Sequence, residues 1–223
     1  MNLRVLRVRK KGIMNFYGKR VLFIGAHPDD IELGAGALIH NILPHCDVTC
    51  VTLSDNQKNP NLQNVLSEHY KSMDVLGVPR ENVIVEKFET RYLPAHRQEV
   101  LEYLLKLRRE NKPDIIFVHS EQDIHQDHNT VTQEALRAYR GITVLGFDVV
   151  RSSHGFFPNF FVGVNKEDVN KKIEALKQYK TYADLYYFDE ALLRATMVRH
   201  GALAEKPFAE GFDILRIVGS FKK

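Results

Sequence analysis

The stretch VLFIGAHPDDIELGAG, residues 21–36, decides the fold class. Residues 21–26 are a continuous apolar run, typical of a strand that is buried on both faces in a parallel sheet. From residue 33 to residue 43 the apolar residues recur with helical spacing, and the pattern stops at Pro44. A buried strand followed directly by a helix predicts the opening unit of an α/β fold.

The same alternation of strands and helices continues to about residue 147. We expect further strands at 47–53, 82–85, 114–118 and 143–147, and helices at 62–76, 94–111 and 129–139. This order predicts a Rossmann-like, doubly wound, mostly parallel sheet in a three-layer α/β/α arrangement. Beyond residue 147 we expect extended or turn structure at 151–165, helices at 166–180 and 189–200, and a last strand at 212–218.

Length and composition fit a single globular domain over residues 1–223, with 44% hydrophobic and 26% charged residues. No run of 18 apolar residues exists, so we expect no integral membrane segment. A formal charge of +3 gives no indication of a nucleic-acid partner. The only two cysteines, Cys46 and Cys50, argue against an oxidising compartment. We therefore expect a cytoplasmic protein.

Residues 1–19 form a basic N-terminal extension that lacks the apolar core of a signal peptide. It is either a basic surface arm or an extended start to the chain. We favour the second interpretation, because Met14 would begin the chain shortly before the first strand.

The turn after the first strand, GAHPDD, carries the first group of metal-ligand side chains. Pro28 fixes one φ angle and restricts the residue before it, so this turn should hold His27 and Asp30 in one defined geometry. An imidazole and a carboxylate three residues apart can bind one divalent metal ion. Asp29 then stays free for another role.

The segment HSEQDIHQDHNT, residues 119–130, places His125, Asp127 and His128 where a helix should begin after the fourth strand. In a sheet of order 3-2-1-4-5, strands one and four are neighbours, and the crevice between their carboxyl ends is the usual ligand site. Two histidines and a carboxylate with an open position suit catalytic zinc, and also iron(II). His27, Asp30 and one of the two later histidines would be the ligands. Helix capping is the alternative role for each of these side chains.

Several stretches together resemble the PIG-L (LmbE-like) family of zinc-dependent N-acetylglucosaminyl deacetylases. The resemblance covers about residues 20–218. The stretches are AHPDD at 26–30, IELGAGALI at 31–39, PDIIFVHS at 113–120, HQDH at 125–128 and EGFDILRI at 210–217.

The resemblance implies a role for each motif residue. His27, Asp30 and His128 match the zinc ligands, and the resemblance, not the residues alone, selects His128 over His125. Asp29 matches the general base. His125 matches the histidine that, as a protonated donor, stabilises the oxyanion, and Asp127 would orient it. The implied reaction is hydrolysis of an acetamide to acetate and a free amino sugar.

Other features concern the substrate. Arg91, Arg151 and His154 lie in loops after strands and are candidates to contact it, although surface salt bridges or turns would also explain them. The loops at 54–61 and 180–188 depart from the family pattern, which leaves the identity of the N-acetylated amino sugar open. We interpret the sequence GAG at 34–36 as close packing of the first helix on the sheet, since a dinucleotide loop would lie in the turn before the helix.

We also consider two other functions. One is a metal-dependent hydrolase for another bond, either an amidase for sugar-thiol or amino-acid conjugates or a metallophosphoesterase. The other is a non-catalytic module that binds a sugar or nucleotide. The resemblance also implies assembly into a homo-oligomer.

Overall fold

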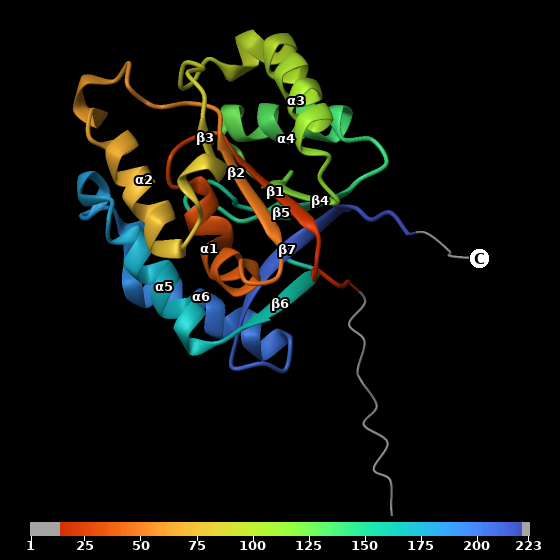
Figure 1. The fold of residues 1–223 in the computed structure, drawn as a ribbon. Helices are drawn as coiled ribbons and strands as arrows, with labels where there is room; N and C mark the ends of the chain where they lie inside the picture. The colour runs from red at the N-terminus through yellow and green to blue at the C-terminus, as the bar shows by residue number, and fades with distance from the viewer. Residues whose placement is uncertain (1–13, 220–223) are drawn as a thin grey trace, which may run out of the picture.

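The computed structural model describes residues 14–219, which form a seven-stranded sheet of order β3-β2-β1-β4-β5-β7-β6 between two layers of helices (Figure 1). The strands are β1 (Arg20–Gly25), β2 (Asp47–Thr52), β3 (Val83–Val85), β4 (Ile115–His119), β5 (Thr143–Phe147), β6 (Phe160–Val164) and β7 (Phe208–Arg216). The α-helices are α1 (Asp30–Ile42), α2 (Val65–Leu76), α3 (Arg97–Asn111), α4 (Gln126–Ala138), α5 (Lys166–Leu176) and α6 (Glu190–Leu203). The expected α/β fold is confirmed.

Side chains that alternate along each strand build one apolar core on each face of the sheet. Val21 and Phe23 of β1 pack under α1, α2, α5 and α6. Leu22 and Ile24 of the same strand pack under α3 and α4. Figure 1 shows the two layers on opposite sides of the sheet. The continuous apolar run in β1 is therefore explained by burial on both faces.

The strand order 3-2-1-4-5 is confirmed, and β1 to β5 pair in parallel. β1 lies between β2 and β4, and the helices that follow β1 and β4 cover opposite faces. This is the switch point at which an α/β sheet opens a crevice at the carboxyl ends of its strands. The residues that follow β1 and β4 therefore meet at one place.

The antiparallel edge of the sheet was only partly predicted. β6 lies inside the segment expected to be extended or turn structure, and β7 begins at Phe208, earlier than expected. β7 pairs antiparallel with β5 and β6, so the sheet is mixed at this edge. The sequence pattern missed β6 because its residues are only partly buried and show no clean alternation.

Helices α1 and α4 each begin three residues earlier than expected, at Asp30 and Gln126. At the start of α4, the side chain of His125 accepts a hydrogen bond from the backbone N–H of Asp127, as an N-cap. The two polar motifs are thus the N-terminal turns of helices, and their backbone geometry is fixed by the helices that they begin.

Helix α1 is interrupted at Ala35, where φ is −144°. Two buried side chains, Glu210 of β7 and Lys172 of α5, form an ion pair at this break. Glu210 accepts hydrogen bonds from the N–H groups of Ala37 and Leu38, and Lys172 donates to Leu33 O. The close packing expected of the GAG sequence is confirmed next to this break. A Cβ on Gly34 would lie 2.3 Å from Cδ2 of Phe147 in β5.

The N-terminal extension is described only from residue 14 onward, and the prediction for residues 1–13 lies outside the described residues. Residues 14–19 are not a separate arm, because Met14 and Phe16 pack against the core. The Phe16 ring stacks on Phe117 with a centroid separation of 6.2 Å. Among residues 14–219, every helix is too short or too polar to cross a membrane.

Candidate metal centre

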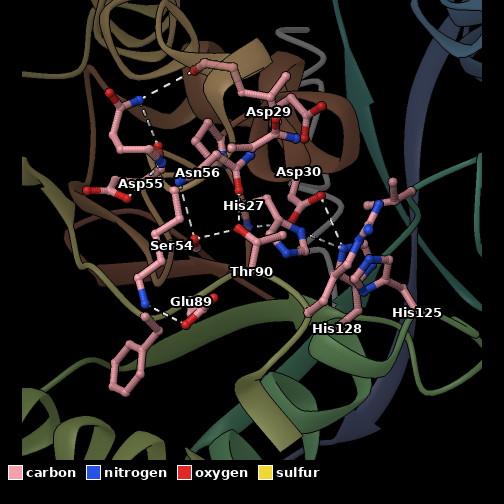
Figure 2. A pocket seen from close by; sticks show the side chains of 18 of the residues that line it. His27, Asp29, Asp30, Ser54, Asp55, Asn56, Glu89, Thr90, His125 and His128 are labelled. Carbon is pink, nitrogen blue, oxygen red and sulfur yellow. Dashed lines mark hydrogen bonds and ion pairs between the residues drawn. The ribbon is translucent and has the colours of Figure 1, made fainter.

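A cavity of about 490 Å³ opens at the carboxyl ends of the parallel strands. Its floor carries His27, Asp29, Asp30, His125 and His128, and Figure 2 shows these side chains together. The walls come from the loops after β2, β3 and β5 and from the segment 182–187. The segments that follow β1 and β4 are far apart in the chain and meet here, as the strand order predicted.

The turn between β1 and α1 is held by the carboxylate of Asp30. Its Oδ2 accepts hydrogen bonds from the backbone N–H groups of Ala26 (3.1 Å) and His27 (2.8 Å). The next residue back, Asp29, has a φ of 102°, a strained value for a residue with a side chain. Asp29 stands at the N-cap position of α1 but makes no capping hydrogen bond. Asp29 also lines the cavity.

Acceptor atoms of three side chains converge beside this turn, and each oxygen of Asp30 faces one of the two imidazoles. His27 Nδ1 lies 3.2 Å from His128 Nε2 and 3.5 Å from Asp30 Oδ2, and His128 Nε2 lies 3.4 Å from Asp30 Oδ1. Metal–ligand bonds of about 2.0–2.1 Å in a tetrahedral site put neighbouring ligand atoms about 3.3 Å apart. The spacing of these atoms therefore fits one divalent metal ion.

In His27 and His128, the ring nitrogen that points away from the other histidine has a carboxylate partner, which fixes the tautomer. His27 Nε2 lies 2.9 Å from Asp127 Oδ2, and His128 Nδ1 lies 2.8 Å from Asp123 Oδ2. Because a carboxylate accepts, both of these nitrogens donate a proton, and the inner nitrogens keep their lone pairs. Carboxylate–histidine–metal arrangements have this form. The repulsion between facing lone pairs would be relieved either by a metal ion or by a proton on one of the two inner nitrogens.

The electrostatics of the cluster agree with this interpretation. Burial opposes the charging of His27, but its hydrogen bonds to Asp127 and Asp30 outweigh burial and raise its pKa to about 10. Burial, with the neighbouring carboxylates of Asp30 and Glu32, raises the pKa of Asp29 well above its usual range. Without a metal ion, the raised pKa thus favours a proton on His27, next to the acceptor atoms of His128 and Asp30.

Two further histidines, His119 and His125, lie beside these three side chains. His119 is buried and stacks on His128 with a centroid separation of 3.9 Å. It lies within ligand distance of Asp30 and His128, but its Nε2 already accepts the N–H of Ala26 at 3.0 Å. His125 also groups with His27 and His128, and its Nδ1 accepts the N–H of Asp127 at 3.2 Å. Among the described residues the possible ligands therefore form two overlapping groups, His27 with His125 and His128, and Asp30 with His119 and His128.

Asp127, expected to orient His125, contacts it through its backbone N–H, while its carboxylate has other partners. Asp127 Oδ2 binds His27 Nε2 and the N–H of Arg91, and Oδ1 binds the N–H of Leu93. The side chain points this way because Asp127 lies in the first turn of α4, which faces the loop after β3. Only the backbone of Asp127 contacts His125.

The resemblance implies a protonated His125, whereas its environment in this structure favours the neutral ring. Burial, followed in importance by His128, lowers the pKa of His125 to about 4. With its Nδ1 accepting a backbone N–H, neutral His125 carries its proton on Nε2. The ring is therefore still a hydrogen-bond donor.

Comparison with known proteins gives a family match. The family model described as PIG-L, GlcNAc-PI de-N-acetylase, matches residues 22–139. The chain belongs to the PIG-L family. The matched region contains both polar motifs, so the resemblance found in the sequence is confirmed.

Individual relatives of this PIG-L protein agree with the match. It is 30% identical over 173 residues to the uncharacterized deacetylase YaiS of Escherichia coli, covering 73% of this chain and 91% of the relative. It is 24% identical over 222 residues to the diacetylchitobiose deacetylase of Thermococcus kodakarensis, covering 86% and 82%. The solved N,N'-diacetylchitobiose deacetylase of Pyrococcus horikoshii superposes with a TM-score of 0.73 at 20% identity, covering 88% and 84% of the two chains. This last likeness shows a shared fold.

The residues expected to contact substrate divide into two groups. Arg91 and Arg151 line the cavity of this PIG-L protein. Arg151 lies over the ring of Tyr187, with its guanidinium carbon 5.4 Å from the ring centroid. His154 is exposed and does not line the cavity. In that loop the buried Ser152 turns inward, and the N–H of His154 bonds back to Ser152 O at 3.2 Å.

The sequence prediction missed four residues of the site: Asp123, His119, Tyr182 and Tyr187. Asp123 lies inside the quoted segment 119–130, and an acid close to a metal-binding histidine is a usable signal for an outer partner. His119, the last residue of β4, occurs in the same segment. Tyr182 and Tyr187 line the cavity from the segment 180–188, which the sequence marked as a departure that concerns the substrate without singling out these two residues.

Proposed function

We propose that this PIG-L protein is a metal-dependent deacetylase that hydrolyses the acetamide of an N-acetylated amino sugar. The observation that carries the proposal is the convergence of His27, Asp30 and His128 beside the carboxylate of Asp29, in a cavity of a PIG-L chain. The names of the relatives, which are deacetylases, support the reaction type.

His27 Nδ1, His128 Nε2 and one oxygen of Asp30 would hold the metal ion. When bound, such an ion polarises an acyl oxygen and lowers the pKa of water. Zinc is the first choice for two imidazoles and a carboxylate, and the same set also accepts iron(II). The outer carboxylates, Asp127 and Asp123, keep both rings oriented for this task.

Asp29 acts as the general base. Its carboxylate lines the cavity next to Asp30, is 8% exposed, and has a raised pKa that makes it a stronger proton acceptor than a solvated aspartate. It takes a proton from the attacking water. As the C–N bond breaks, the same proton passes to the departing amine, which gives acetate and a free amine.

His125 stabilises the negative charge that develops on the acyl oxygen. Its ring lies beside those of His27 and His128, with centroid separations of 4.9 Å and 4.3 Å, and its neutral Nε2–H is free to donate into the cavity. One such donor is worth about 3 kcal/mol of transition-state stabilisation in comparable enzymes. The strained backbone at Asp29 and the N-cap bond of His125 fix both groups before substrate arrives.

The substrate class is an N-acetylated amino sugar or its conjugate. Two relatives carry the name diacetylchitobiose deacetylase, which supports an acetamido sugar. The cavity is in the size range of small-molecule sites and has polar walls that include Arg91 and Arg151. We assign these two arginines to contacts with the substrate beyond the acetamide.

The test is release of acetate and free amine. Metal-free protein is loaded with Zn²⁺ or Fe²⁺ and incubated with N-acetylglucosamine and with N,N'-diacetylchitobiose, and products are identified by mass. We expect loss of one acetyl group, at a rate at least about 10²-fold lower in Asp29→Asn. Zinc affinity should be retained in that variant, because Asp29 is not among the three converging ligands.

Two results would reject the proposal. Deacetylation at the wild-type rate by Asp29→Asn would exclude Asp29 as the base. Turnover of another amide without acetate release would assign the site to an amidase. His154→Ala serves as the matched control, since His154 does not line the cavity, and its rate should equal that of the wild type.

A further inference from the structure

Asp123 is a buried carboxylate that is not one of the three proposed metal ligands and does not line the cavity. It lies in the loop between β4 and α4, and only 2% of the residue is exposed. A buried carboxylate is costly unless it accepts several hydrogen bonds, so its partners indicate its role.

The partners of Asp123 belong to two different parts of the site. Its Oδ2 accepts from His128 Nδ1 at 2.8 Å, and from the hydroxyls of Ser152 at 2.9 Å and Ser153 at 3.4 Å. Its Oδ1 accepts the backbone N–H of His125 at 2.8 Å. One oxygen atom therefore joins a metal ligand to the loop after β5.

That loop forms a wall of the cavity. Residues 149–153 fold as a turn, in which the N–H of Ser152 bonds to Val149 O at 2.9 Å. The loop is joined a second time to the segment of Asp123, by the N–H of Ile124 and Ser152 O at 2.9 Å. Arg151 projects from this turn and lines the cavity, so the position of the turn sets the position of Arg151.

Asp127 provides a contrast. It holds the other histidine ligand, His27, but contacts its own wall only through the backbone N–H groups of Arg91 and Leu93. Asp123 contacts its wall through two side-chain hydroxyls. The link from Asp123 to the wall can therefore be removed without touching the bond to His128.

We propose that Asp123 is a positioning residue that couples the metal centre to the substrate wall at 149–153. It fixes His128 in the tautomer that frees Nε2, and the same oxygen holds Ser152 and Ser153. A metal ion on Nε2 makes the Nδ1–H a stronger donor, which strengthens the bond to Asp123 and orders the carboxylate that holds the wall. This inference rests on the proposed function, because it treats His128 as a metal ligand.

The experiment measures two quantities that need no substrate. One is the Zn²⁺ dissociation constant, from competition with a chelator. The other is amide hydrogen exchange of the peptides that cover residues 147–155, with and without Zn²⁺. The variants are Asp123→Asn and the double variant Ser152→Ala/Ser153→Ala, with Asp127→Asn as the matched control.

In the wild type we expect Zn²⁺ to slow exchange at 149–153. Asp123→Asn should bind Zn²⁺ about 10- to 100-fold more weakly and lose the effect of Zn²⁺ on exchange. The double serine variant should exchange faster at 149–153 while its Zn²⁺ affinity stays within about threefold of the wild type. Asp127→Asn should weaken Zn²⁺ binding but leave exchange at 149–153 in the metal-free protein unchanged.

Two outcomes would overturn the coupling. One is wild-type Zn²⁺ affinity in Asp123→Asn, and the other is exchange at 149–153 that does not respond to Zn²⁺ in the wild type. If Asp123→Asn does not fold, the proposal is also overturned when amide exchange at 149–153 in the double serine variant equals that of the wild type. Because neither readout uses turnover, a protein with no deacetylase activity would leave this test intact.

Discussion

Leaving either member of the ion pair in the break of helix α1 without its partner should strongly destabilise the fold. Glu210 and Lys172 are 2% and 4% exposed, and they meet at 2.6 Å between Glu210 Oε1 and Lys172 Nζ. Glu210 also caps the N–H groups of Ala37 and Leu38, at 3.2 Å and 2.7 Å. The perturbation is removal of either charge, in Lys172→Met or Glu210→Gln.

Each single variant leaves one charge buried without its partner. Breaking a buried pair in this way costs about 3–5 kcal/mol, a large part of the stability of a domain. Lys172→Met keeps the side-chain stem that packs on Gly36, so lost packing contributes little. In the double variant no charge is buried, and the amide oxygen of Gln can still accept from the two backbone N–H groups. We therefore expect the double variant to lose only about 1–2 kcal/mol, less than either single variant.

The assay is urea unfolding of all four proteins in a chelator, so that metal binding does not contribute to the free energy of unfolding. The reasoning would be refuted if each single variant lost under about 1 kcal/mol. It would also be refuted if the double variant lost the sum of the two single losses, because the charges would then act independently.

Further predictions concern the metal, the packing of α1 and the response to pH. Zn²⁺ at about 100 times its dissociation constant should raise the free energy of unfolding by about 2.7 kcal/mol, and thermal melts of His128→Ala should show little of this gain. Gly34→Ala should cost about 1–3 kcal/mol in urea unfolding, since the new Cβ would lie 2.3 Å from Phe147, and a smaller residue at 147 should recover part of the loss. Burial lowers the pKa of His200 from 6.5 to about 4, so the unfolded chain binds the extra proton first as pH falls. The free energy of unfolding should therefore keep its full value above pH 6.5 and fall by at most about 3 kcal/mol between pH 6.5 and pH 4 because of His200. Urea unfolding of His200→Leu at a series of pH values should lack this fall.

The sequence by itself determined the parallel part of the sheet and the place of the site. Strand and helix periods are local properties, so the order of β1 to β5 followed from apolar spacing together with the rules for α/β connections. His27 and Asp30 share one turn, and their proximity followed from three residues of separation and a proline. The carboxyl ends of neighbouring parallel strands then brought the second motif to the first.

Only the tertiary structure decided which nitrogen atoms face the centre. Those directions depend on the hydrogen-bond partner of the other ring nitrogen. The N–H of Asp127 donates to His125 Nδ1, and His128 Nδ1 donates to Asp123. His128 Nε2 is then left facing Asp30. The outward turn of His154 and the antiparallel edge strand β6 were also beyond the sequence pattern. Hydrogen-bond direction is set by three-dimensional contacts between residues far apart in the chain, whereas periodicity and spacing record only near neighbours.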